Sequence, residues 1–150
     1  MKKILLALFL TGFVAMSQAQ LNPISWTFSA KKTGDKTYEL QMKATIQAKW
    51  HLYSQTQPED AVAMPTTFVL NPNPLFTLEG KIKESGKMEK FTDKTLGVSA
   101  NQYSNTVTFT QVVKLKSKVK TSITGTVEYQ TCDDQKCLPP KKVNIKVAMD

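Results

Sequence analysis

The sequence predicts an all-β protein with an immunoglobulin-like antiparallel β-sandwich fold, on three observations. Several segments alternate apolar and polar residues with a period of two, which is typical of half-buried strands. Turn-forming residues separate these segments, and no window shows the apolar repeat of a capped amphipathic helix. The 150 residues suffice for one domain of this size with a single core. An up-and-down barrel is the alternative architecture.

The clearest strand pattern covers residues 38–46, where apolar side chains alternate with Glu, Gln, Lys and Thr. Trp26 and Phe28 alternate similarly before it, and Thr33-Gly34-Asp35-Lys36 predicts the hairpin turn between the two segments. Further strands are expected in residues 106–115, 123–129 and 143–147.

Three stretches lack such a pattern. Residues 54–65 are polar and contain two prolines, and Asn71-Pro72-Asn73-Pro74 interrupts any strand. Between Lys81 and Ser104 the alternation is weak, and Gly86 and Gly97 interrupt it. The sequence therefore assigns no clear strand to residues 81–104.

The first 19 residues predict a secretory signal peptide. Lys2 and Lys3 precede a short apolar run, and Ser17-Gln18-Ala19 places small residues where an export peptidase reads them. We therefore expect a mature domain of residues 20–150, periplasmic or secreted, that does not insert into a membrane after cleavage.

Charge argues against a nucleic-acid partner. All 20 basic residues are lysine, and they are scattered rather than clustered. Arginine is the residue that most often forms bidentate contacts with phosphates and bases, so its absence weakens this function class. We therefore expect the lysines to form a solvated polar surface and the protein to be a monomer.

Any chemistry lies in the pair Cys132 and Cys137, which sits between two strand patterns and is expected in a hairpin loop or sheet corner. In an exported protein two cysteines at this spacing predict an intramolecular disulfide. Closing so small a ring stabilises the fold by only about 2 kcal/mol. A structural bridge and a redox site both remain open at this point.

The neighbouring residues predict ordinary thiol acidity. Asp133 and Asp134 disfavour thiolates, whereas Lys136 favours them, and no helix N-terminus is expected nearby. A zinc site is not expected, because the two cysteines and the lone His51 leave the zinc shell one ligand short. We expect no metal and no cofactor, and the sequence contains no hydrolase motif.

Three landmarks resemble the N-terminal periplasmic domain of DsbD, the thiol:disulfide interchange protein. Residues 127–140, from Val-Glu-Tyr-Gln-Thr-Cys to Cys-Leu-Pro-Pro, are similar to the redox loop of that family. Trp50-His51-Leu52-Tyr53 resembles its aromatic strand beside the site, and Glu89-Lys90-Phe91 resembles its cap loop. The order and spacing of the landmarks extend the resemblance over nearly the whole mature chain.

The resemblance implies an immunoglobulin-like sandwich that relays reducing equivalents through Cys132 and Cys137. A thioredoxin-like donor would reduce the disulfide, and the dithiol would then reduce a partner through mixed disulfides. Cys137 would bond to partners and Cys132 would resolve. Phe91 with Glu89 would cap the sulfurs. Tyr53, Trp50 and His51 would line the site, although Phe91 and these three could equally be core residues.

Two departures from the family bear on this expectation. Full-length members continue into a membrane domain and a thioredoxin-like domain, whereas this sequence ends at Asp150, so a separate protein would have to supply the electrons. The loop between the cysteines is also about one residue shorter than in the best-known members. The alternative function is a non-catalytic binding or assembly module with a structural disulfide, because sandwich folds host many recognition functions.

Overall fold

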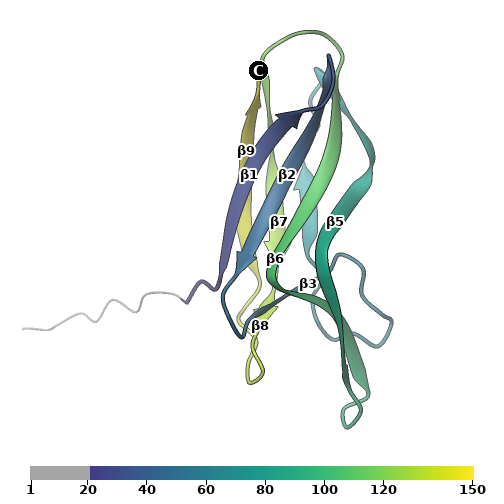
Figure 1. Cartoon of the computed structure of the whole chain (residues 1–150), viewed down its shortest axis with the longest axis vertical. Helices are drawn as coiled ribbons and strands as arrows, with labels where there is room; N and C mark the ends of the chain where they lie inside the picture. Colours follow the sequence, from purple (N-terminus) through teal and green to yellow (C-terminus); the bar gives the residue numbers. More distant parts are fainter. Residues whose placement is uncertain (1–20) are drawn as a thin grey trace, which may run out of the picture.

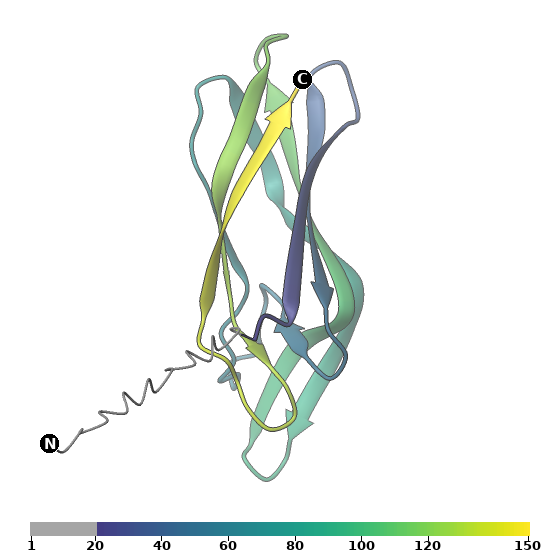
Figure 2. The same cartoon turned by 90° about the vertical axis from the view of Figure 1, so that its left-hand side faces the viewer.

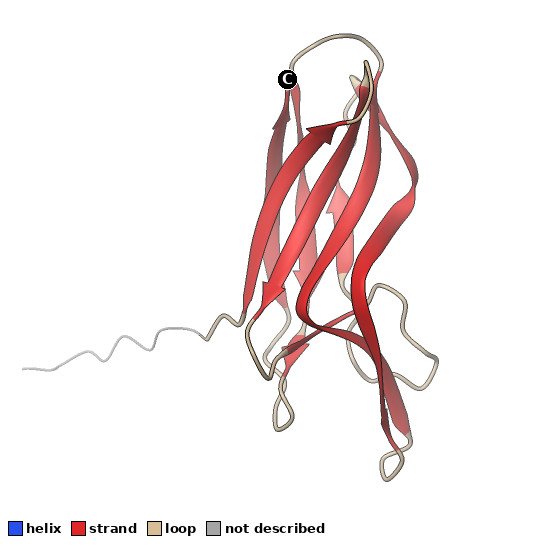
Figure 3. Cartoon of the chain, in the orientation of Figure 1, coloured by secondary structure: helices blue, strands red, loops and turns tan. Residues whose placement is uncertain are grey.

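A computed structural model describes residues 21–150, and the predicted signal peptide lies outside the described residues. All regular structure in the described part of the chain is strand (Figure 3). The strands in chain order are β1 (Ile24–Lys32), β2 (Thr37–Ile46), β3 (His51–Tyr53), β4 (Thr67–Leu70), β5 (Phe76–Asp93), β6 (Val98–Leu115), β7 (Thr121–Tyr129), β8 (Thr131–Cys132) and β9 (Lys141–Met149).

The strands form two antiparallel sheets that face each other across one core (Figures 1 and 2). The six-stranded sheet has the order β1-β2-β6-β3-β8, with β5 paired to β6, and the three-stranded sheet has the order β4-β7-β9. The fold is therefore an immunoglobulin-like β-sandwich, and the prediction of the fold class is confirmed.

The core lies where the sequence alternation places apolar side chains inward. Leu40 and Met42 of β2, Phe109 of β6 and Val127 of β7 are completely buried. Aromatic rings join the two sheets, because Phe68 of β4 packs on Phe109 at a centroid distance of 4.9 Å. The strands expected in residues 38–46, 106–115, 123–129 and 143–147 lie within β2, β6, β7 and β9, so these predictions are confirmed.

The long β5–β6 hairpin occupies residues 81–104, where the sequence assigned no clear strand. β5 is an edge strand, and most of its residues are exposed. After Phe76 no residue of this edge strand is buried, so it needs no apolar alternation, and its lysines discourage pairing with other chains. The period-two signal is therefore missing although the strand is 18 residues long.

β6 bends near Asn105, the residue at which its pairing changes from β3 to β2. Asn105 has a φ of 65°, and the register with β5 shifts between Gly86 and Met88. A Cβ atom on Gly86 would lie only 3.0 Å from the carbonyl oxygen of Thr106. This bulge separates two regions of the sheet.

We call the two regions the body and the cysteine end. The body contains β1, β2, β4, β7, β9 and residues 76–86 and 106–115. The cysteine end contains β3, β8, the cysteine loop (residues 132–137), the covering loop (residues 54–66) and the hairpin end (residues 88–104). The cysteine loop and the tip of the β5–β6 hairpin project from the same end of the molecule, opposite the C-terminus (Figures 1 and 2).

Candidate functional site

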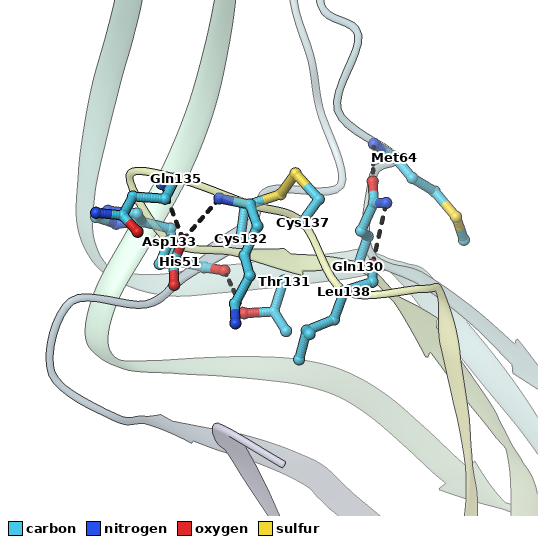
Figure 4. Close-up of a disulfide and its surroundings, with 10 residues drawn as sticks. His51, Met64, Gln130, Thr131, Cys132, Asp133, Gln135, Cys137 and Leu138 are labelled. Carbon is cyan, nitrogen blue, oxygen red and sulfur yellow. Dashed lines mark hydrogen bonds between the residues drawn. A yellow bond between two sulfur atoms is a disulfide. The ribbon is translucent and has the colours of Figure 1, made fainter. Parts of the chain in front are cut away.

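Cys132 and Cys137 form a disulfide across a tight turn (Figure 4). They are paired as an isolated antiparallel bridge, with Cα atoms 4.0 Å apart. Two backbone hydrogen bonds flank the pair: Asp133 N donates to Lys136 O at 2.9 Å, and Leu138 N donates to Thr131 O at 2.9 Å. The turn connects the β7–β8 segment to β9, as predicted for a hairpin loop.

The turn is also fixed by the side chain of Asp133. Its Oδ1 accepts hydrogen bonds from Gln135 N at 2.9 Å and Lys136 N at 2.7 Å (Figure 4). These two donors hold the pKa of Asp133 below its usual value because they favour the ionised carboxylate. Asp133 thus stabilises the turn, a role that could not be predicted from its position beside Cys132.

The two cysteines differ in exposure. Cys132 is only 4% exposed and forms a small apolar cluster with Tyr53 and Ala100, and Ala63 packs against this cluster. Cys137 is exposed. An attacking thiolate must reach a sulfur along the S–S axis, and Cys137 is the more accessible of the two cysteines for such an approach.

Strand register places most of the predicted site residues on one face. His51 pairs directly with Cys132 between β3 and β8, and Tyr53 is two residues further along β3. Directly opposed residues of an antiparallel pair share a face, with Cβ atoms about 5 Å apart. His51, Tyr53 and Cys132 therefore face the same side. Burial raises the pKa of Tyr53, which keeps its hydroxyl neutral.

The same face continues across β6 onto β5. Tyr53 is opposite Gln102, and Gln102 is opposite Glu89. Ala100, which packs in the cluster with Cys132, is opposite Phe91. The register thus brings the Glu89–Phe91 segment onto the face that carries the buried cysteine.

Phe91 is 47% exposed, so it is not a core residue. Together with Pro58, Ala100 and Asn101 it lines a hollow between the hairpin end and the covering loop. Trp50 differs from the other predicted site residues. It is 8% exposed and belongs to the main core, apart from the cluster of Cys132, Tyr53 and Ala100.

Glu84 is a residue of this region that the sequence analysis missed. It lies on β5 near the bulge, and its carboxylate accepts from Ser54 Oγ at 2.8 Å, Gln55 N at 2.6 Å and Tyr103 Oη at 2.5 Å. Burial and the Glu84 charge raise the pKa of Tyr103. These bonds attach the start of the covering loop to the hairpin. No local sequence pattern could show them, because the partners are 19 to 30 residues apart.

The far end of the covering loop is attached separately. Thr66 Oγ1 donates to Tyr53 O at 2.6 Å, and Met64 N donates to Gln130 Oε1 at 3.4 Å (Figure 4). The loop that the sequence describes as irregular is therefore held at both ends, and Ala63 packs against the cluster of the buried cysteine.

A chain of polar contacts crosses the cysteine end. Glu89 Oε2 accepts from Ser104 Oγ at 3.0 Å, and Ser104 Oγ lies 3.1 Å from His51 Nδ1. On the other side of the ring, His51 Nε2 lies 3.7 Å from Asp134 Oδ1. The predicted site residues His51 and Glu89 are thus connected through Ser104, a residue that the sequence analysis did not identify.

Within residues 21–150 no cluster of three or more His, Cys, Asp or Glu side chains has the arrangement of a metal site. Across the same residues the structure also has no helix long and apolar enough to cross a membrane. The disulfide joins a buried cysteine, Cys132, to an exposed one, Cys137.

Comparisons with known proteins give consistent results. The family model described as "Thiol:disulfide interchange protein DsbD, N-terminal" matches residues 18–148. No match was found among curated proteins. The fold is similar to the reduced DsbD N-terminal domain of Neisseria meningitidis, with 14% identity, a TM-score of 0.53, and coverage of 83% of this chain and 86% of that one.

Two further solved structures are similar. One is the complex of the DsbD N-terminal and PilB N-terminal domains of N. meningitidis, with 16% identity, a TM-score of 0.55, and coverage of 85% of this chain and 87% of the other. The second is the N-terminal periplasmic domain of ScsB from Proteus mirabilis, with 14% identity, a TM-score of 0.54, and coverage of 82% and 44%. At these identities the similarity shows the fold.

Proposed function

The chain belongs to the family of the N-terminal domain of the thiol:disulfide interchange protein DsbD, and from this membership we propose that it relays reducing equivalents between partner proteins through Cys132 and Cys137. The donor and the acceptor are thioredoxin-like proteins. The solved complex between a DsbD N-terminal domain and a PilB N-terminal domain supports a protein partner of the disulfide.

The observation that supports this proposal is the unequal exposure of the two cysteines. A donor thiolate attacks the exposed Cys137 sulfur, the S–S bond breaks, and Cys132 leaves and takes up a proton. The second donor thiol then attacks the mixed disulfide and releases Cys137 as a thiol. Two electrons and two protons pass to this chain, and the donor becomes a disulfide. The reverse sequence reduces the acceptor.

In this function the Glu89–Phe91 segment acts as a cap. Phe91 is opposite Ala100, which packs with Cys132, so its half-exposed ring stands on the face of the buried sulfur. The ring screens the pair from small oxidants and moves aside when a partner docks. Truncation in Phe91→Ala is expected to speed the reaction of the reduced protein with a small alkylating reagent, without a comparable loss of stability.

The exchange takes place in an oxidising compartment, the bacterial periplasm. The predicted signal peptide supports this location, and the structurally similar domain of ScsB is also periplasmic. Disulfides persist in that compartment, so the pair can cycle between its two states only if a dedicated donor reduces it.

The first experiment measures the reduction potential of the pair by equilibration with glutathione or dithiothreitol buffers and trapping of free thiols. A potential above about −250 mV lies in the range of thiol-exchange proteins and supports the relay. A potential below about −300 mV marks a structural bridge and favours the alternative, a binding module whose binding survives Cys132→Ser combined with Cys137→Ser.

A matched pair of variants tests the direction of attack. Cys132→Ser leaves the exposed sulfur without its resolving partner and is expected to accumulate mixed disulfides with a thioredoxin-like protein. Cys137→Ser leaves only the buried sulfur and is expected to accumulate far fewer. Equal trapping through both cysteines would contradict the proposed roles.

A further inference from the structure

The polar chain Glu89–Ser104–His51–Asp134 links the hairpin end to the cysteine loop through the only histidine of the sequence. The histidine side chain is 20% exposed, whereas Asp134 is 86% exposed. Asp134 lies inside the ring that the disulfide closes, and His51 is the cross-strand neighbour of Cys132. The imidazole is therefore placed between a partly buried network and the redox loop.

The hydrogen-bond donors and acceptors of Glu89, Ser104 and His51 determine the tautomer of the imidazole. An ionised Glu89 carboxylate only accepts hydrogen bonds, so the single proton of the Ser104 hydroxyl is donated to it. The Ser104 oxygen must then accept from His51 Nδ1, which lies 3.1 Å away. The neutral imidazole therefore carries its proton on Nδ1 and leaves Nε2 bare.

The bare Nε2 faces the Asp134 carboxylate at 3.7 Å. A nitrogen lone pair beside a carboxylate oxygen gains nothing, whereas a protonated Nε2 forms an ion pair with it. Histidine is the one side chain whose ordinary pKa lies between pH 5 and 8. A proton on Nε2 of His51 thus makes the contact between the ring and Asp134 attractive.

We propose that His51 is a positioning residue for the cysteine loop, and that protonation of its Nε2 attracts Asp134 and favours the disulfide over the dithiol. Reduction removes the covalent restraint on the ring that contains Asp134 and leaves that loop to its hydrogen bonds alone, so the ion pair is stronger in the oxidised state than in the dithiol. Acidification therefore stabilises the disulfide and weakens its reduction. The inference deepens the proposed function, on which its biological meaning rests.

The other charged groups around the imidazole do not provide this contact. Asp133 turns its carboxylate to the backbone of its own loop, and Lys136 is exposed on the same turn. On β3 and β8 the neighbours on the same face are Tyr53, which burial keeps neutral, and Cys132, which titrates only after reduction. Two carboxylates therefore act on the imidazole: Asp134 contacts it directly, and Glu89 is connected to it through Ser104.

The first test reads the tautomer directly. With one histidine in the chain, the imidazole ¹⁵N signals of oxidised protein are unambiguous. Neutral wild-type protein is expected to carry the proton on Nδ1, and Ser104→Ala is expected to lose this bias because the Nδ1 acceptor is gone. A wild-type imidazole protonated on Nε2 would overturn the inference.

The second test measures the coupling without relying on exchange activity. The ¹⁵N titration of His51 is compared in oxidised wild type and in Cys132→Ser combined with Cys137→Ser, whose loop is open. Proton binding by the imidazole is expected to be about two- to fivefold weaker in the open-loop protein, the range of a mostly exposed ion pair. Asp134→Asn should reduce the difference to nothing, whereas Glu39→Gln, on β2, should leave it intact. Equal titration in closed and open loops would refute the coupling even if the protein proved an active relay.

The third test measures how protonation of His51 changes the equilibrium between the disulfide and the dithiol. Reduction by dithiothreitol transfers two electrons and two protons, and no net protons are taken up or released while all thiols stay protonated. A pH dependence of the reduction equilibrium below pH 7 therefore shows that another group changes its protonation on reduction. The equilibrium constant for reduction is expected to fall about two- to fivefold from pH 7 to pH 5 in wild type. It should stay flat in His51→Asn and Asp134→Asn. A dependence that persists in Asp134→Asn would overturn the inference, while resistance to dithiothreitol would count against the proposed function alone.

Discussion

The body and the cysteine end are stabilised by different interactions. In the body, fully buried side chains such as Leu40, Phe109 and Val127 meet between two sheets, and the ladders are long and regular. The cysteine end has strands of two and three residues and a cluster of only three buried side chains. Apart from the β5–β6 ladder, side-chain hydrogen bonds between distant residues hold its segments together. A rigid scaffold thus carries an end whose arrangement depends on a few polar contacts.

The largest effect is expected from Phe109→Ala in the body. Phe109 is completely buried and touches Trp26 and Phe68, so truncation removes apolar contacts from both sheets. We expect a loss of about 3–5 kcal/mol in the free energy of unfolding, measured by denaturant titration. Phe91→Ala is the matched control, since Phe91 is 47% exposed, and it should change stability far less. Equal losses for both phenylalanines would remove the distinction between the two regions.

Loss of the disulfide should have a smaller effect. The bridge closes a ring with a sequence separation of five, so the chain-entropy estimate for Cys132→Ser combined with Cys137→Ser is about 2 kcal/mol. The body should remain folded, with unchanged hydrogen-exchange protection in β2 and β6. Collapse of the whole fold would show that the bridge stabilises more than its own turn.

Glu84→Gln is expected to cost about 1 kcal/mol, because a charged acceptor of three hydrogen bonds becomes neutral. The effect should be local, with faster hydrogen exchange at Gln55 and in the covering loop. The titration of Tyr103 should also move down in pH, because the Glu84 charge contributes to raising its pKa. Tyr103→Phe serves as the control that removes one donor and leaves the carboxylate. Unchanged exchange of the loop in Glu84→Gln would contradict its attachment to Glu84.

The smallest effect concerns the turn itself. The amides of Gln135 and Lys136 lower the pKa of Asp133. The contribution of its carboxylate to the stability of the turn is therefore complete above the usual pKa of aspartate, near pH 4. That contribution is lost as the pH falls through the lowered pKa. Amide chemical shifts of Gln135 and Lys136 should report this transition, and Asp133→Asn should abolish it. No shift of these amides in acid would contradict the turn geometry.

The sequence predicted the body far better than the cysteine end, and the reason is physical. Strands with one buried face, such as residues 38–46, carry the period-two signal, so fold class and most strands were predictable. After Phe76, β5 has no buried residue, and the rest of the strand was missed. The disulfide was predictable from the spacing of the cysteines and the expected compartment. Strand register places His51, Tyr53, Glu89 and Phe91 on the face of Cys132, and their roles at the site stay predictions. Glu84 and Ser104 act through partners far along the chain, which no local pattern contains.

The two backbone hydrogen bonds that flank the cysteines, Asp133 N to Lys136 O and Leu138 N to Thr131 O, do not depend on the sulfur–sulfur bond. After reduction they keep the two thiols side by side, which gives each a high effective concentration toward the other. Under the proposed function, a partner joined to Cys137 would then be displaced quickly by Cys132. Mixed disulfides of the wild-type chain would be brief, and turnover would be set by docking and release of the partner rather than by resolution of the covalent intermediate.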